Sequence, residues 1–135
     1  MKRSLMIFVL IIMTAFAGEI KAQSQSEKVA SGISKLIREN NMIKLSSYFH
    51  DPVDLNIGGK KGIYSKQQSV VMIKDFFTTY PVSSFKINHT GSSQKKMVYS
   101  IGTYQSKQIV FRTYFLFKKE NGNYKIYQFH FEKEK

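Results

Sequence analysis

The sequence predicts a single α+β domain in which amphipathic helices precede an antiparallel sheet. Apolar residues recur at three- and four-residue spacing through the first half of the chain, and they alternate with polar residues through the second half. The chain has 135 residues and no cysteine. A disulfide-stapled miniprotein and a cysteine-ligated metal domain are therefore excluded, and the apolar core must supply the stability.

The N-terminus has the three-part form of a secretory signal peptide. A Lys-Arg pair precedes an apolar run over residues 5–16, which is too short to span a bilayer. Cleavage after Ala22 divides the chain into a signal peptide of residues 1–22 and a domain of residues 23–135, with Ala17 as an alternative position. Because a lipoprotein leader requires a cysteine, we expect a periplasmic or secreted product without a membrane anchor.

The chain is strongly basic, with 21 Lys and Arg against 9 Asp and Glu and a formal net charge of +12. Nucleic-acid binding requires clustered cations. Here the basic residues stand singly or in pairs beside expected turns, such as Lys60-Lys61. We therefore interpret the charge as a solvated basic surface that favours solubility, and we expect no nucleic-acid partner.

Two helices are predicted at the start of the domain. A capping-box pattern at Ser24 opens the first, which runs from about Gln25 to Glu39. A second, shorter apolar stripe over residues 42–49 is stopped by His50-Asp51-Pro52, because the residue before a proline avoids the helical region. His50 is accordingly expected to cap the end of this helix.

A short strand and a third helix follow. Residues 53–57 alternate, and the glycine-containing segment 58–62 is interpreted as a flexible basic loop. A second capping box at Ser65 opens a helix that Pro81 ends. Its apolar stripe, the clearest in the chain, consists of Val70, Ile73, Phe77 and Tyr80, flanked by Phe76.

The rest of the chain is predicted to form strands. Apolar and polar residues alternate over residues 85–90 and 97–102. Asn121-Gly122, between two aromatic-rich runs, is a strong signal for a two-residue type I′ turn, because both residues tolerate positive φ. We therefore predict a β-hairpin centred on this pair.

The turn predicts a register for the hairpin. Both of its faces are then largely apolar, so each should be covered, one by the helices and the other by a partner or a further element of the chain. A homodimer through the sheet is the simplest such cover, because so small a chain has few other elements. The predicted pairs are Phe117 with Ile126, Phe115 with Gln128, Thr113 with His130 and Phe111 with Glu132 on one face, and Leu116 with Tyr127, Tyr114 with Phe129 and Arg112 with Phe131 on the other.

The order and motifs of the chain resemble a known family. Helix, helix, strand, helix and then long strands is similar to the nuclear-transport-factor-2-like superfamily, which includes ketosteroid isomerase. Several motifs look like those of an exported bacterial family, domain of unknown function 4783. The resemblance implies a cone-shaped fold with a strongly bent antiparallel sheet wrapped around about three N-terminal helices and a pocket at its wide end, and it implies no activity. The motifs include Gly62-Ile63-Tyr64-Ser65-Lys66-Gln67, Lys74-Asp75-Phe76-Phe77 and Phe111-Arg112-Thr113-Tyr114-Phe115.

The predicted register places a few polar groups in an apolar wall, which is the composition of a ligand pocket. His130 shares a hairpin face with Thr113 and Gln128 in this register. The candidate pocket lining is therefore Tyr99, Thr113, Phe115, Gln128 and His130. Their polarity also fits an alternative, that they approach the solvated end of the sheet.

No catalytic residue, metal site or cofactor is predicted. The three histidines lack the spacing of metal ligands, and the chain has neither a Gly-x-Ser-x-Gly elbow nor a Walker phosphate loop. The sequence therefore favours a non-enzymatic module that binds a small molecule or peptide, or that acts through protein interaction. Two alternatives stay open: an isomerase- or dehydratase-type enzyme with His130 or Asp54 as base and Tyr99 as donor, and a structural dimer without a cavity.

Overall fold

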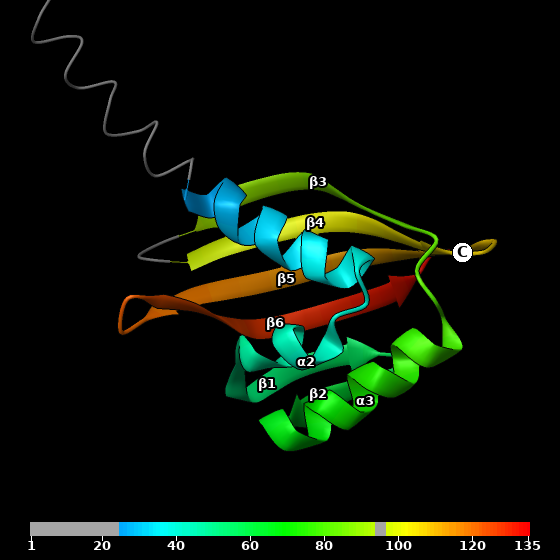
Figure 1. The fold of residues 1–135 in the computed structure, drawn as a ribbon, viewed down its shortest axis with the longest axis horizontal. Coiled ribbons are helices and arrows are strands. Elements are labelled where there is room, and N and C mark those ends of the chain that lie inside the picture. Colours follow the sequence, from blue (N-terminus) through cyan, green and yellow to red (C-terminus); the bar gives the residue numbers. More distant parts are fainter. Residues whose placement is uncertain (1–24, 94–96) are drawn as a thin grey trace, which may run out of the picture.

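The computed structural model describes residues 25–93 and 97–135 (Figure 1). The predicted signal peptide, both cleavage positions and the capping residue Ser24 lie outside the described residues. A helix over residues 25–38 comes first. It is followed by α2 (Met42–Ser47), β1 (Phe49–Ile57), β2 (Lys60–Tyr64), α3 (Lys66–Thr79), β3 (Ser84–Ser93), β4 (Met97–Ser106), β5 (Ile109–Glu120) and β6 (Asn123–Lys133).

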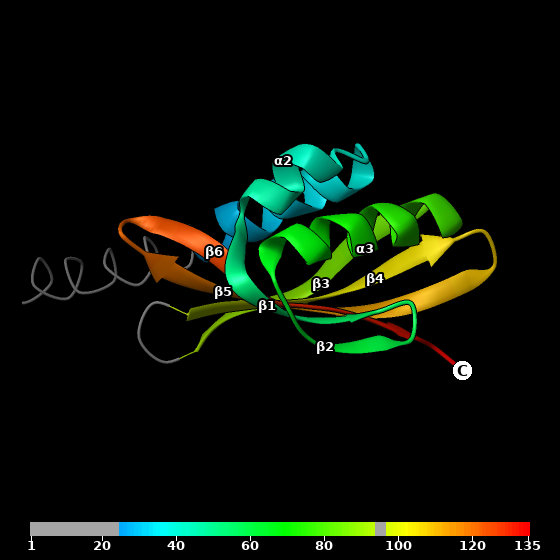
Figure 2. The ribbon, with the colours of Figure 1, turned by 90° about the horizontal axis from the view of Figure 1, so that it is seen from below.

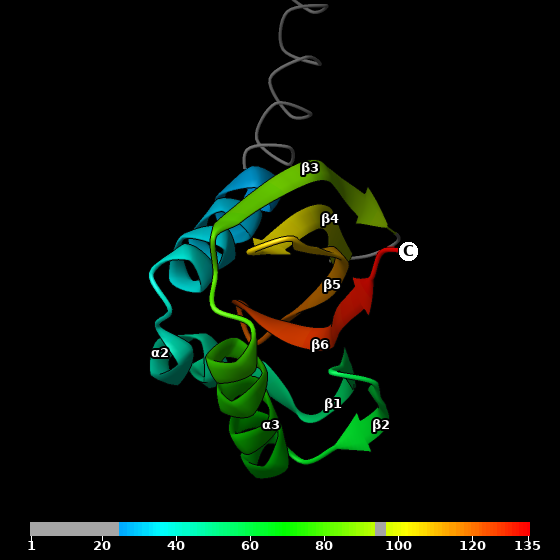
Figure 3. The ribbon, with the colours of Figure 1, turned by 90° about the vertical axis from the view of Figure 1, so that its right-hand side faces the viewer.

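The six strands form one curved sheet in the order β2-β1-β6-β5-β4-β3. The helices lie against one face of this sheet, which we call the inner face, and the sheet bends around them without closing (Figures 2 and 3). This confirms the predicted α+β fold with a bent sheet. The expectation of a wholly antiparallel sheet is wrong at one place, because β1 enters beside β6 and runs parallel to it.

The first two helices are separated by a tight turn. The first buries Ile33, Leu36 and Ile37. Asn40 then adopts a φ of 56°, a left-handed conformation that ends the helix. The side chain of Asn41 accepts a hydrogen bond from the backbone N–H of Lys44 at 3.2 Å and so caps α2.

The segment after α2 differs from the prediction. The helix ends at Ser47, and Phe49 begins β1, so His50 lies in a strand and is not a helix cap. The predicted loop over 58–62 is largely strand β2. Gly58 and Gly59, with φ of 58° and 78°, form a two-residue turn that leads the chain back antiparallel to β1. A side chain is disfavoured at such φ, which explains the glycine pair.

The third helix forms as predicted. Ser65 and Gln68 make the reciprocal hydrogen bonds of a capping box at its N-terminus. Ile73, Phe76 and Phe77 are buried against the sheet. Burial of a side chain of this size contributes roughly 1.5–3 kcal/mol, so packing rather than helix propensity holds α3 in place.

The hairpin turn is confirmed, but most of the predicted register is wrong. Asn121 and Gly122 have φ of 48° and 82°, and Phe117 pairs with Ile126 as expected. A β-bulge then adds Tyr127 to β6, and this extra residue moves every later side chain of β6 to the opposite face. The observed pairs are Leu116 with Gln128, Phe115 with Phe129, Tyr114 with His130, Thr113 with Phe131 and Arg112 with Glu132.

The bulge gives the hairpin one apolar face instead of two. Phe115 and Phe129 stack on the inner face with ring centroids 4.7 Å apart. Beside them the fully buried Tyr104 donates a hydrogen bond from its hydroxyl to the carbonyl of Tyr80 at 2.5 Å. Burial raises the pKa of Tyr104, so the phenol stays a neutral donor. The core therefore lies between this face and the helices.

Candidate functional site

The five predicted pocket residues do not come together. Thr113 and Phe115 are fully buried on the inner face. Gln128 and His130 lie on the outer face, because they pair with Leu116 and Tyr114, and Tyr99 also faces outward because it pairs with Leu116. The bulge at Tyr127 thus separates residues that a continuous register places side by side.

Two polar contacts mark the outer face. His130 Nε2 lies 3.2 Å from Asp54 Oδ1, which forms an ion pair when the imidazole is protonated. His89 Nε2 lies 3.1 Å from the hydroxyl of Tyr99. The residues of the enzyme alternative are therefore on this face, but Tyr99 contacts His89 rather than His130 or Asp54.

A second cluster lies on β1 and β6 near the hairpin. The rings of His50 and Tyr127 stack with centroids 4.0 Å apart, and His50 Nε2 is 3.4 Å from Glu120 Oε1. The Tyr127 hydroxyl donates a hydrogen bond to the same carboxylate. Burial, and then the hydrogen bond and charge of Glu120, raise the pKa of Tyr127 to about 12.

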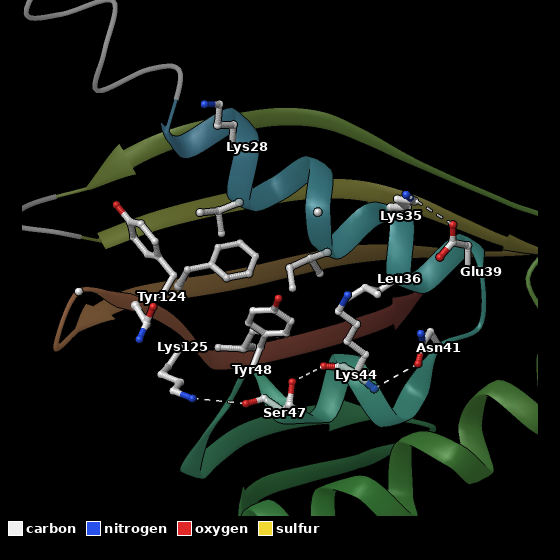
Figure 4. A pocket seen from close by; sticks show the side chains of 17 residues that line it. Lys28, Lys35, Leu36, Glu39, Asn41, Lys44, Ser47, Tyr48, Tyr124 and Lys125 are labelled. Atoms are coloured by element: carbon white, nitrogen blue, oxygen red, sulfur yellow. Dashed lines mark hydrogen bonds and ion pairs between the residues drawn. The ribbon is translucent and has the colours of Figure 1, made fainter.

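The main cavity lies elsewhere, between the N-terminal helix, α2 and the tip of the β5–β6 hairpin (Figure 4). We call it the helix groove. Its volume is about 700 Å³. Apolar side chains make its walls and floor, namely Val29, Ile33, Leu36, Phe117 and Ile126. Tyr48 rises from the end of α2 into the groove, and Tyr124 stands at its hairpin side.

The rim of the helix groove is basic. Lys28, Lys35, Lys44 and Lys125 line it with a single carboxylate, that of Glu39. Glu39 lies 4.0 Å from the ammonium group of Lys35. Lys125 donates from Nζ to the carbonyl of Ser47 at 3.3 Å. Among the described residues the ammonium groups of Lys28 and Lys44 have no partner, so the groove carries an unneutralised positive charge.

The local sequence explains how the groove opens. The Asn40-Asn41 turn places α2 beside the N-terminal helix and leaves space between them. Gly32, inside the helix, lines the groove, and a Cβ added there meets no atom within 4 Å. The sequence interpretation missed this site because it joins segments far apart in the chain. Glycine in the helix interior, which costs about 1 kcal/mol relative to alanine, was the available signal.

A smaller cavity of about 190 Å³ lies between the β1–β2 turn and α3. Gly58, Met72 and Asp75 are among the residues that line it. Within the described ranges, no group of three His, Asp or Glu side chains is placed to hold a metal ion. No helix of the described part is long and apolar enough to cross a bilayer.

Comparison with known proteins defines the class. A protein of unknown function from Shewanella baltica, described as NTF2-like, superposes with a TM-score of 0.64 over 86% of this chain and 96% of its own at 11% identity. At this identity the likeness concerns the fold alone. The bent sheet and its helices therefore define a nuclear-transport-factor-2-like fold.

The sequence comparison gives the family. The model of the family Domain of unknown function (DUF4783) matches residues 30–132, and the chain belongs to this family. A family member from Bacteroides uniformis is 28% identical, with a TM-score of 0.71 over 78% of this chain and 96% of that one. A member from Bacteroides ovatus is 29% identical, with a TM-score of 0.70 over 77% and 94%. No curated protein matches the sequence.

Proposed function

We propose that this protein is an exported, non-enzymatic module that binds a small ligand in the helix groove. The volume of the groove, about 700 Å³, carries the proposal. Pockets for small molecules typically measure about 300–1,000 Å³ and combine apolar walls with a few polar groups. The helix groove has a volume in this range, and its lining combines five apolar side chains with a rim that is richer in lysine and tyrosine than a typical pocket.

The position of the acid–base groups supports a binding role over catalysis. A general base must lie within hydrogen-bond reach of its substrate. His130 and Asp54 are on the outer face, away from the helix groove. The carboxylate of the groove, Glu39, is half-exposed and ion-paired with Lys35. The enzyme alternative therefore has neither of its two candidate bases in the helix groove.

Gly32 provides the test of the proposed site. Gly32→Phe puts a ring into the groove, whereas the matched control Gly32→Ala adds only one methyl group. We expect native mass spectrometry of the protein as it is isolated from its own cells to show a retained small molecule on the wild type and on Gly32→Ala but not on Gly32→Phe. Equal retention by all three proteins would place the ligand elsewhere, and a wild type without any bound molecule would argue against the proposal.

Export is tested by the same preparation. The predicted leader has a basic pair, an apolar run and small residues at the cleavage positions. We expect the protein from the cell envelope or medium to begin at Gln23, or at Gly18 if cleavage follows Ala17. An intact mass that retains Met1 in every cell fraction would contradict export.

A second candidate, a homodimer through the outer face of the sheet, has one specific observation in its favour. Among the described residues no helix or strand covers this face (Figure 2). Leu116 pairs with Tyr99, and Tyr114 pairs with Ile101, so four large side chains adjoin at its centre. An uncovered patch of this kind is typical of an interface between subunits.

A further inference from the structure

We infer that the ligand of the helix groove is a single-chain amphiphile with one carboxylate or phosphate head group. The inference rests on the proposed binding role of the groove and adds the chemistry of its ligand. Two features lie side by side there: an apolar strip along the N-terminal helix, and unpaired cationic and hydroxyl groups on α2.

The charge of the groove selects an anion. Four lysines and one glutamate line it, and Lys35 partly neutralises that glutamate at 4.0 Å. A cleft lined by one sign of charge above apolar walls concentrates its field, because the walls have a low dielectric constant. A cationic ligand would meet repulsion here, and a neutral one would gain hydrogen bonds from the rim but no attraction between charges.

The charge is strongest at the end of α2. Lys125 and Lys66 both donate from Nζ to the carbonyl of Ser47, at 3.3 Å and 3.4 Å. The carbonyls at a helix C-terminus attract cations, which explains why two ammonium groups meet there. One carbonyl oxygen cannot neutralise two unit charges, and Lys125, the one of the two lysines that lines the groove, keeps this end of it positive.

Lys44 and Tyr48 supply the direct contacts. The side chain of Lys44 extends from α2 toward Leu36 of the N-terminal helix, and the ring of Tyr48 stands beside it in the groove (Figure 4). Tyr48 is 37% exposed, so its ring is accessible to a ligand in the groove. In the described part of the chain neither Lys44 Nζ nor the Tyr48 hydroxyl has a hydrogen-bond partner. A carboxylate or phosphate oxygen accepts from both.

The apolar strip fits the tail of the ligand. Val29, Ile33 and Leu36 recur along one side of the N-terminal helix and line the groove. Ile33 and Leu36 are 4% and 7% exposed, so the half-buried Val29 offers most of the accessible apolar surface of this strip. Gly32 leaves the middle of the strip without a side chain. An alkyl chain laid here contributes roughly 0.8 kcal/mol for each buried methylene. A free inorganic anion would leave this strip empty, so head group and tail are both needed.

The test compares four probes. Decanoate, decyl phosphate and decanol carry a ten-carbon chain, and inorganic phosphate carries none. Binding is measured by isothermal titration calorimetry on the mature protein isolated from its own cells. We expect decanoate and decyl phosphate to bind at least tenfold more tightly than decanol, and inorganic phosphate to bind more weakly than any of them. Higher salt should weaken the two anionic amphiphiles and leave decanol unchanged.

Substitutions test which residues bind the head group of the ligand. Lys44→Met keeps the apolar stem and removes the charge, so we expect it to weaken decanoate about five- to tenfold and leave decanol unchanged. Tyr48→Phe should have a smaller effect in the same direction. Lys74→Met, on the exposed side of α3, is the charge-matched control and should change neither ligand. Gly32→Phe should abolish the binding of both.

The outcomes separate the inference from the proposed function. If decanol binds as tightly as decanoate, or Lys44→Met has no effect on decanoate, while Gly32→Phe still abolishes binding, the groove is a binding site and its preference for anions is wrong. If no ten-carbon probe binds, or Gly32→Phe binds like the wild type, the groove itself is not the site. Tighter binding of inorganic phosphate than of decanoate would contradict the role of the apolar strip.

Discussion

Two glycines, Gly32 and Gly102, occupy opposite environments in this fold. A Cβ at Gly32 meets nothing within 4 Å, whereas a Cβ at Gly102 lies 2.6 Å from the carbonyl of Lys86 and 2.9 Å from Thr113 Oγ1. We expect Gly32→Ala to raise the free energy of unfolding by about 0.5–1 kcal/mol, because alanine restricts the unfolded chain and favours the helix. Gly102→Ala should lower it by about 1–3 kcal/mol, because β3 and β4 must separate.

Urea denaturation of the two alanine variants measures both effects. A destabilised Gly32→Ala would mean that the N-terminal helix has a different packing at this position. If Gly102→Ala had the same free energy of unfolding as the wild type, β3 and β4 would be able to move apart without loss of stability. Because both variants replace glycine by alanine, opposite changes in the free energy of unfolding must come from the two environments and not from the substitution itself.

The titration of Tyr127 should make the free energy of unfolding fall with rising pH in the alkaline range. Its pKa is raised from an ordinary 10.0 to about 12 in the folded chain, by burial first and then by Glu120. Between these values the unfolded chain loses the phenolic proton more readily than the folded chain, so the stabilisation from this group is complete below pH 10 and is lost as the pH rises to 12. We expect the stability difference between wild type and Tyr127→Phe to shrink over this interval.

Urea midpoints at pH 8, 10 and 11.5 check this dependence. Subtracting the variant from the wild type removes the contributions of the other tyrosines and the lysines, which both proteins share. A constant difference across the three pH values would show that Tyr127 titrates alike in the folded and unfolded chains. Absorbance at 295 nm reports the phenolate directly.

At the scale of the elements, the β-bulge in β6 decides what the sheet presents on each face. It turns Phe129 inward and Gln128 outward, the reverse of an uninterrupted register. We expect Phe129→Ala to cost about 3–5 kcal/mol, because the ring is fully buried against Phe115. Gln128→Ala should change the stability by about 0.5 kcal/mol or less, as for a surface position.

Urea denaturation of these two variants distinguishes the registers. If Gln128→Ala were the more damaging substitution, β6 would pair without the bulge, and the outer face would carry the phenylalanines. Circular dichroism of each variant confirms that the sheet is retained.

The elements show why the hairpin was only partly predictable. The Asn121-Gly122 turn has a local cause, the tolerance of both residues for positive φ, and it was found from the sequence. The bulge depends on tertiary burial. On β5 every second residue faces inward. On β6 the inward residues are Ile126, Phe129 and Phe131, so the spacing is three residues at the bulge and two residues after it. That irregular spacing of apolar residues indicates the bulge, but it can be interpreted only once it is known which residues face the core.

The site was less predictable than the fold for a similar reason. Periodicity and capping patterns identify elements one at a time, so they predicted the helices and the order of the strands. The helix groove is formed by side chains from residues 28–48 and 117–126, and no local pattern couples these segments. The candidate residues were chosen instead on a register that the bulge interrupts.

For the whole molecule, the corrected register also changes the argument for a dimer. The outer face of the hairpin is not as apolar as predicted, since Gln128, His130 and Glu132 lie on it. What stays uncovered is a smaller patch of Tyr99, Ile101, Tyr114 and Leu116 on β4 and β5. Such a patch is sufficient for an isologous contact only if a second copy places the same residues against it.

We expect sedimentation velocity to find the wild type as a dimer at micromolar concentration and Leu116→Glu as a folded monomer. The substitution places two like charges in the centre of the interface, whereas in the monomer Leu116 is partly solvated and a glutamate is tolerated. Val71→Glu is the matched control, because Val71 is a large apolar residue, 67% exposed, on α3 away from the sheet. A wild type that sediments as a monomer would contradict the dimer, and dissociation by Val71→Glu would move the interface to the helices.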